Sequence, residues 1–512
     1  MQRFLEKHAD KILGTVSIFD RLIFKGYLQG LGFEEGMENF LSRHDVLLKD
    51  FRDFTKKQSA VLKDHAQHLA AKAGRPYSYL PDKQRKEALA HAIASKDGIT
   101  QGLICVLAVT EQCQSYAMRS GEGKPRLARC QPQCLCLYFY YIDRDFGFMH
   151  VRLQTWFPFV IQVYVNGHEW LAKQLDEREI GYTKLENAFL GIDDFPAAQQ
   201  IADDFVRRKW QSILWLFARR VNPLLKTLLH GMDYYWVTDQ SEYATDVVFK
   251  DKASLKDLYK RLHRHVTVCF GPEDVLRFLG KKPNGNFTGE LTTECKKRWQ
   301  GVRVKHRMKQ NYMKMYDKFG VVLRIEVVIN HPYDFPIRRW GMHDGEKELG
   351  WFPMAKRVSN LYRYAEVSIA ACKRYLDALA VVDDPSAAYK LLDGVCEPAT
   401  YGHRWRRGLN PLRRDDMRLF EAVLRGEHHL RGFTNRDLGA LLGYSHPPDA
   451  PERRKICAKV TRLIQLLRAH GLIAKVPRSR RYHVSLRGMA IIAAAVHLRE
   501  DDLPDKIHEQ VA

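Results

Sequence analysis

The fold of this chain is indicated most clearly by residues 452–486, ERRKICAKVTRLIQLLRAHGLIAKVPRSRRYHVSL. Apolar residues recur there at helical spacing as far as residue 470, and Gly471 ends the predicted helix. Two short apolar segments follow, separated by the basic turn PRSRR at 477–481. We therefore predict a long amphipathic helix followed by a two-stranded β-hairpin with a basic tip.

Two shorter helices are predicted before this stretch, at residues 416–424 and 435–442. Thr434 can cap the second of them and Gly443 can end it, and a Pro-containing turn occupies residues 445–451. The order helix, helix, turn, helix, hairpin is typical of a winged helix-turn-helix domain.

This segment resembles the winged-helix regulators of the MarR type. In that family the second helix of the pair enters the DNA major groove, and the hairpin, or wing, contacts the backbone or the minor groove. The resemblance implies that nucleic acid is bound by Arg453, Arg454, Lys455, Lys459 and Arg462 on the helix and by Arg478, Arg480 and Arg481 on the wing. A winged helix that binds protein is the alternative.

Charge also favours a polyanionic partner. The 512 residues carry a formal net charge of +22, and residues 401–500 hold 21 Lys/Arg against 8 Asp/Glu, a net of +13. DNA is the expected partner, with RNA left open. No apolar run approaches the roughly 20 residues of a spanning helix, and the N-terminus has no signal-peptide apolar region, so we expect no membrane association and a cytoplasmic location.

Length and periodicity predict a multidomain α+β protein. β-rich runs at residues 136–143, 148–155 and 159–165 predict a meander, and further strands are predicted at 15–27, 102–109, 234–249 and 302–329. Helices are predicted at 37–73, 83–94, 168–175, 197–229 and 366–379. We predict an N-terminal α/β region at 1–100, a central α+β domain with an antiparallel sheet at 101–400, a winged-helix domain at 401–500 and a tail at 501–512.

A second informative stretch is residues 305–330, KHRMKQNYMKMYDKFGVVLRIEVVIN. It predicts a basic strand at 305–317, a turn at Phe319-Gly320 and a second strand at 321–329. Glu326 lies in an otherwise apolar strand, where a carboxylate is costly unless it meets a cation. Its partner is predicted to be Lys305, Arg307, another basic residue of the hairpin or a divalent ion.

This hairpin resembles one in rolling-circle replication initiators and conjugative relaxases, although the paired histidines of the better-known relaxases are missing here. The resemblance implies metal-dependent DNA nicking. Tyr316 or Tyr312 would be the nucleophile, Glu326 and Asp317 would lie near Mg²⁺ or Mn²⁺, and Lys305, Arg307 and Lys314 would contact nucleic acid. Candidates for a further carboxylate ligand are Asp143, Asp145, Glu242 and Asp246. A salt-bridged hairpin in a nucleic-acid-binding sheet is the alternative.

The whole chain is similar to a large bacterial family that shares FDR at 19–21, YVNGHEWLA at 164–172, EYATD at 242–246 and LRIE at 323–326. The members of that family are uncharacterised, so the resemblance implies an association with mobile genetic elements and no established activity. The predicted function is DNA recognition through the C-terminal domain, in replication or mobility of a genetic element. Alternatives are a metal-dependent nickase, an RNA-binding protein of a ribonucleoprotein and a MarR-like transcriptional regulator.

Two further patterns each allow two interpretations. Cys130, Cys134 and Cys136, with Cys113 upstream, predict either a zinc site or buried thiols. The aromatic run at residues 138–141 predicts either a surface on which bases stack or part of the core.

Overall fold

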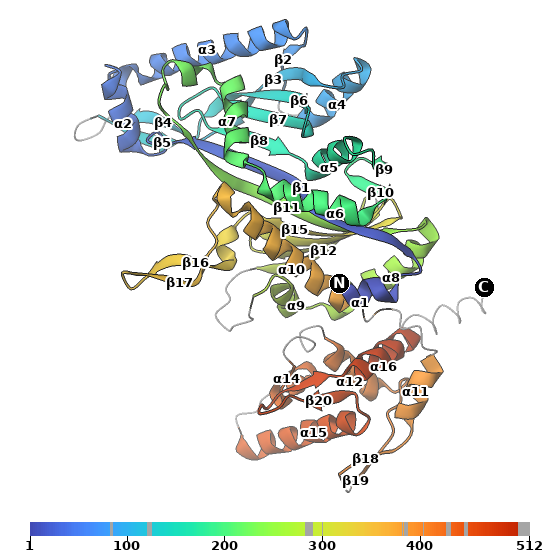
Figure 1. Cartoon of the computed structure of the whole chain (residues 1–512). Coiled ribbons are helices and arrows are strands. Elements are labelled where there is room, and N and C mark those ends of the chain that lie inside the picture. The colour runs from blue at the N-terminus through green and yellow to red at the C-terminus, as the bar shows by residue number, and fades with distance from the viewer. Residues whose placement is uncertain are drawn as a thin grey trace. The chain divides into compact units, whose positions relative to one another are not determined.

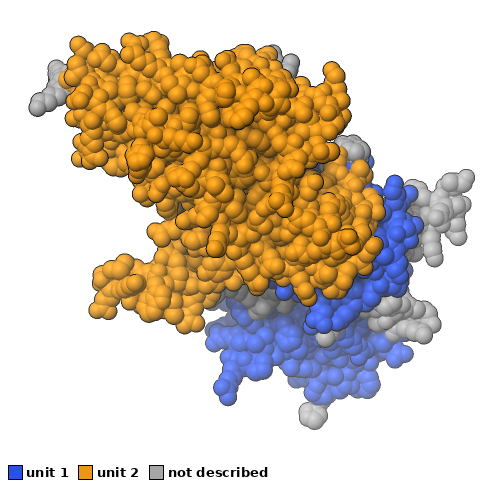
Figure 2. Space-filling view, turned by 45° about the horizontal axis from the view of Figure 1, so that its top comes forward, with its two compact units in different colours: residues 1–13, 249–325, 370–512 blue, residues 14–248, 326–369 orange. Residues whose placement is uncertain are grey.

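The computed structural model describes residues 1–81, 85–119, 125–281, 290–298, 301–380, 382, 388–402, 404–425, 432–444 and 449–499. Contacts divide the chain into two compact units, each assembled from separated segments (Figure 2). Unit 1 comprises residues 1–13, 249–325 and 370–512, and unit 2 comprises residues 14–248 and 326–369. The predicted boundaries at 100 and 400 therefore do not separate these units.

Unit 2 is built on one large sheet (Figure 1). In sheet order its strands are β15 (Val322–Ile329), β11 (Tyr234–Phe249), β1 (Ile12–Leu28), β8 (Ile161–Val165), β7 (Gly147–Gln154), β6 (Gln133–Asp143), β3 (Gly102–Gln112) and β2 (Tyr77–Tyr79). The contact division places the first residues of β1 and β15 and the last residue of β11 in unit 1. The predicted meander is confirmed, because β6, β7 and β8 are consecutive antiparallel neighbours.

The helices of unit 2 bury apolar side chains on one face. Their bounds are α2 (Glu34–Arg43), α3 (Phe51–Lys72), α4 (Lys86–Lys96), α5 (Gly167–Asp176), α6 (Phe195–Asp204) and α7 (Trp210–Val221). Ala90 and Ala94 of α4 join a core cluster with side chains of β3 and β6. Trp210 of α7 packs against Phe24 and Phe146. The predicted helix at 37–73 is instead two helices, separated by a 3-10 turn at Leu48–Asp50.

Three small hairpins complete unit 2. They pair β4 (Ser115–Arg119) with β5 (Arg126–Cys130), β9 (Tyr182–Leu185) with β10 (Ala188–Ile192), and β16 (Pro336–His343) with β17 (Glu346–Pro353). Helix α10 (Leu361–Leu379) begins in this unit.

Unit 1 contains residues 305–325 of the hairpin predicted at 305–329, with one correction. The basic segment is two strands, β13 (Gly301–Met308) and β14 (Asn311–Lys318), because the chain turns at Lys309, whose φ is +53°. Lys305 therefore lies opposite Lys314, and Arg307 lies opposite Tyr312. The turn predicted at Phe319-Gly320 is confirmed, since both residues have positive φ. Strand β12 (Leu291–Arg298) pairs with β13.

Unit 1 also contains eight described helices, of which α9 contacts β12 and β13. They are α1 (Gln2–Lys7), α8 (Lys252–Cys269), α9 (Pro272–Phe278), α11 (Ala388–Cys396), α12 (Arg414–Leu424), α14 (Asn435–Leu441), α15 (Ala450–Ala469) and α16 (Leu486–His497). Thr434 caps α14 in a capping box with Asp437, as the sequence predicts for a helix beginning there. Strands β20 (Ile473–Lys475) and β21 (Tyr482–Val484) form the hairpin after α15, and β18 (Ala399–Tyr401) pairs with β19 (Arg404–Arg406).

The C-terminal helices share one core, in which Val460, Ile464 and Leu467 of α15 are buried with Phe420 and Phe433. The predicted tail at 501–512 and most of the predicted turn at 445–451 lie outside the described residues. Among the helices that the structure describes, none is both long enough and apolar enough to cross a membrane.

Candidate metal centre

Three carboxylates converge in unit 2. Asp20 of β1, Glu242 of β11 and Glu326 of β15 each offer an oxygen, and these oxygens all lie within 4.8 Å of one another. The three strands are neighbours in the order β15-β11-β1. Adjacent strands are separated by about 4.8 Å, so side chains on one face of neighbouring strands can meet. This arrangement explains how residues far apart in sequence share one site.

Such a cluster needs positive charge. Asp20 and Glu326 are 6% and 2% exposed, and Glu242 is partly exposed. Two like charges 4 Å apart repel by about 4 kcal/mol even at an effective dielectric constant of 20. A bound cation removes this repulsion, and carboxylate oxygens are the ligands that Mg²⁺ and Mn²⁺ prefer. The donor set therefore fits a hard divalent ion.

Polar neighbours, of which His168 and Asp246 are buried, hold Asp20 in place. His168 Nδ1 lies 3.0 Å from Asp20 Oδ1, and His168 Nε2 lies 3.4 Å from Asp246 Oδ2. Asn187 Nδ2 donates to both oxygens of Asp20, at 2.7 and 2.9 Å. Side chains of this kind orient metal ligands and tune their basicity, so His168, Asp246 and Asn187 are positioning residues of the site.

The sequence NGH at residues 166–168 explains how His168 reaches the sheet. The Asn166 side chain caps α5 by accepting from the backbone N–H groups of His168 and Glu169. A Cβ on Gly167 would lie 2.1 Å from the Phe19 carbonyl oxygen, so only glycine lets the helix start so close to β1.

A cation lies within electrostatic reach of these carboxylates. The guanidinium of Arg21 lies over the ring of Tyr164, at 5.6 Å. Burial alone would lower the pKa of Arg21, but the negative charge of Glu242 and of other nearby groups raises it. Arg21 therefore keeps its positive charge under the electrostatic influence of Glu242.

Other carboxylates predicted as candidates lie elsewhere. Asp317 belongs to unit 1, where its Oδ1 accepts from the Gly320 N–H and burial raises its pKa. Asp143 closes a turn by accepting from the N–H groups of Asp145 and Phe146. Asp145 pairs with Arg208 at 2.6 Å. Besides Glu326, five carboxylates were predicted as candidates, and only Glu242 joins Glu326 in the cluster. Asp246 is linked to Asp20 of the cluster through His168.

The candidate tyrosines lie in β14 of unit 1. Tyr312 lies under the ammonium group of Lys305, 3.8 Å from the ring centroid, and Tyr316 pairs in register with Arg303. Lys305, Arg307 and Lys314 form with them a partly exposed basic surface across β13 and β14.

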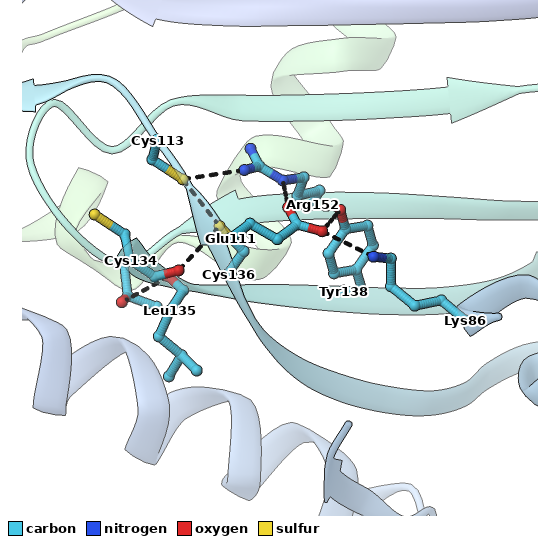
Figure 3. Close-up of polar contacts among 9 residues, drawn as sticks. Lys86, Glu111, Cys113, Cys134, Leu135, Cys136, Tyr138 and Arg152 are labelled. Carbon is cyan, nitrogen blue, oxygen red and sulfur yellow. Dashed lines mark hydrogen bonds and ion pairs between the residues drawn. The ribbon is translucent and has the colours of Figure 1, made fainter. Parts of the chain in front are cut away.

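A second polar cluster in unit 2 surrounds Glu111 (Figure 3). Its carboxylate accepts from Lys86 at 2.8 Å, from the Tyr138 hydroxyl at 2.7 and 2.9 Å, and from Arg152 Nε at 2.9 Å. Burial alone would raise the pKa of Glu111, but these donors outweigh burial and lower it. A polar cavity of about 340 Å³ opens beside this cluster.

The predicted cysteine cluster lies next to Glu111. Cys113 Sγ is 3.4 Å from Cys136 Sγ and accepts from Arg152 at 3.2 Å. Hydrogen bonds with Cys134 and then Cys136, together with Arg152, lower the pKa of Cys113. Within the part of the chain that the structure describes, the carboxylates are the only group of three or more possible ligands that converge within 4.8 Å. The cysteines are mostly buried thiols, and the rings of residues 138–141 are buried in the core.

The predicted nucleic-acid contacts of the C-terminal segment are exposed. This holds for Arg453, Arg454, Lys455, Lys459 and Arg462 of α15 and for Arg478, Arg480 and Arg481 between β20 and β21. The opposite face of α15 is buried in the core, so the helix presents its basic face outward.

No family model, curated protein or solved structure matches this chain.

Proposed function

We propose that this protein cleaves DNA by a metal-dependent reaction at Asp20, Glu242 and Glu326. The observation that carries the proposal is the convergence of three carboxylates on one face of a sheet. The net charge of +22 supports a polyanionic substrate, because it draws nucleic acid towards a site that is itself acidic.

The proposed chemistry is hydrolysis of a phosphodiester. Asp20, Glu242 and Glu326 would hold a divalent ion, which would supply a more acidic bound water and would neutralise charge on the phosphate. The water oxygen bonds to phosphorus and one P–O bond to a sugar breaks, which leaves a phosphate monoester and a hydroxyl. Arg21 would contact the phosphate oxygens, and His168 and Asn187 would keep Asp20 oriented. We assign the nucleophile to water because a divalent ion held by carboxylates lowers the pKa of the water that it binds.

We also propose that the C-terminal segment of unit 1 is a winged helix that brings the protein to duplex DNA. The order of α12, α14, α15 and the β20–β21 hairpin supports this, as does the exposure of the cations on α15 and on the hairpin turn.

The direct test of the proposed cleavage is a supercoiled-plasmid assay with Mg²⁺ or Mn²⁺ and with EDTA as the control. Nicking that depends on the ion supports the proposal, and full activity in EDTA refutes it.

Reversing Arg478, Arg480 and Arg481 to Glu should weaken duplex binding by tenfold or more across unrelated sequences. If each arginine neutralises one phosphate, the slope of log K against log salt should fall by about 2.7, or about 0.9 for each lost contact. Fluorescence anisotropy over a salt series measures both effects.

The matched control reverses three exposed lysines of α3, namely Lys57, Lys63 and Lys72, and so changes the net charge equally. It should lower affinity much less. Equal losses in the two variants would mean that only overall charge matters and that the hairpin turn has no specific contact. Arg454→Ala or Lys455→Ala should change sequence preference more than affinity, because these residues lie on the predicted groove helix.

A further inference from the structure

The hairpin formed by β16 and β17 is a separate two-stranded ribbon of unit 2 (Figure 1). Its strands pair from Pro336 opposite Pro353 to His343 opposite Glu346, and Asp344-Gly345 form the turn with positive φ at both residues. An Asp-Gly turn of this kind matches the natural twist of a hairpin and sets its register. The register fixes which side chains share each face.

One face of this hairpin is apolar, cationic and exposed. The pairs Arg338 with Trp351, Trp340 with Leu349, and Met342 with Lys347 lie on it. Trp351 is 73% exposed, Met342 65%, Trp340 61% and Leu349 46%. Large exposed apolar patches generally mark interaction sites. Two exposed tryptophans on one small surface therefore indicate that this face binds a partner.

The hairpin does not need this face for its own packing. Ile337 and Phe352 lie on the opposite face, where Ile337 is buried and the Phe352 ring fills the space above Gly341. Arg339 also lies there and covers the Phe352 ring at 5.2 Å. The exposed tryptophans can therefore be replaced without removing the packing that holds the hairpin.

The two faces of the hairpin also differ in the charge of their side chains. Glu346 pairs in register with His343, and Glu348 pairs with Gly341 on the face opposite the tryptophans, where His343 Nδ1 lies 3.8 Å from Glu348. The tryptophan face carries Arg338 and Lys347 and no acidic residue. A second copy docked on this face by two-fold symmetry would present the same cations, so the face suits an anionic partner better.

We propose that this face binds single-stranded nucleic acid. Bases stack on Trp340 and Trp351, and Arg338 and Lys347 contact the phosphates on either side. Aromatic side chains combined with cations are the means by which proteins hold unpaired strands without reading sequence. The proposal goes beyond cleavage, because this binding needs neither the carboxylates nor a divalent ion.

The test measures anisotropy of a labelled single-stranded oligonucleotide of mixed sequence, in EDTA, with the full chain. The variant Trp340→Ala/Trp351→Ala should bind about tenfold more weakly for each ring removed. Trp340→Phe/Trp351→Phe should recover much of the affinity, whereas Trp340→Leu/Trp351→Leu should not, because leucine is apolar but cannot stack. Duplex binding should stay unchanged in all three variants.

The control variant replaces Leu216, a 63% exposed apolar residue of α7, by Ala and should bind normally. Single-strand affinity that survives the alanine pair overturns the proposal, as does full rescue by leucine, which would indicate apolar protein contact. Sedimentation that shows a dimer broken by the alanine pair would assign the face to self-association and refute it too. Each result is independent of plasmid nicking, so the proposed cleavage activity stands or fails separately.

Discussion

Glu326→Gln should abolish metal-dependent nicking while the protein stays folded. The amide keeps the shape of the side chain but removes the charge that a divalent ion requires, so activity should fall by at least about 100-fold. Asp20→Asn and Glu242→Gln should behave alike, because the three oxygens converge on one point. Plasmid nicking with Mn²⁺ measures the loss, and circular dichroism checks the fold.

The alternative is that Glu326 only neutralises a buried cation such as Arg324, which lies two residues earlier in β15 and is 1% exposed. In that case Glu326→Gln should cost about 3–5 kcal/mol of unfolding free energy, and Mn²⁺ should not alter the melting temperature of the wild-type protein. A bound ion instead predicts a rise in melting temperature with Mn²⁺ that the variant lacks. Asp317→Asn is the matched control and should keep full activity.

Glu111→Gln should destabilise unit 2 by about 3 kcal/mol, because it leaves the guanidinium of Arg152 without its counter-charge. Arg152 is 8% exposed, and the Glu111 carboxylate also accepts hydrogen bonds from Lys86 and from the Tyr138 hydroxyl (Figure 3). Urea unfolding measures the difference. Asp204→Asn, which breaks an exposed pair with Arg207, is the control and should change stability little. Equal stability of both variants would contradict the role given to Glu111.

Acid should reduce the difference between wild type and Glu111→Gln. The pKa of Glu111 is lower in the folded protein than in the unfolded chain, where it is about 4.3. The stabilisation is therefore complete above the unfolded pKa and disappears as the pH falls through the folded pKa. Unfolding curves at pH 7 and at successively lower pH should converge, and a difference that grows in acid would contradict this assignment.

The sequence predicted much of the fold because local patterns dominate it. The meander at residues 136–165 forms where β-rich runs separated by turn residues predict it. Thr434 caps α14 where a threonine before a helical pattern predicts a cap. The error at Lys309 has a physical reason. The segment around it alternates like a single strand, and a lysine with positive φ gives no glycine or proline to mark the turn.

The candidate site was predictable only in part. Glu326 stood out because a carboxylate in an apolar strand needs a partner, and Glu242 was one of several possible companions. Asp20 and His168 were missed as site residues, although both lie in stretches quoted from the sequence, FDR and NGHEW. Only the order of strands in the sheet shows that Asp20 faces Glu242, and no local pattern encodes that order.

The carboxylates at positions 20, 242 and 326 come from three strands that meet only after long chain segments have closed. Contacts so distant in sequence form late, since their loop-closure entropy must be overcome first. A nascent chain that still lacks β15 cannot hold the complete ligand set, so the proposed cleavage activity should be absent until that strand has been synthesised. Metal affinity should therefore report when folding of unit 2 is complete, and refolding followed by Mn²⁺ binding would show that step as a slow phase.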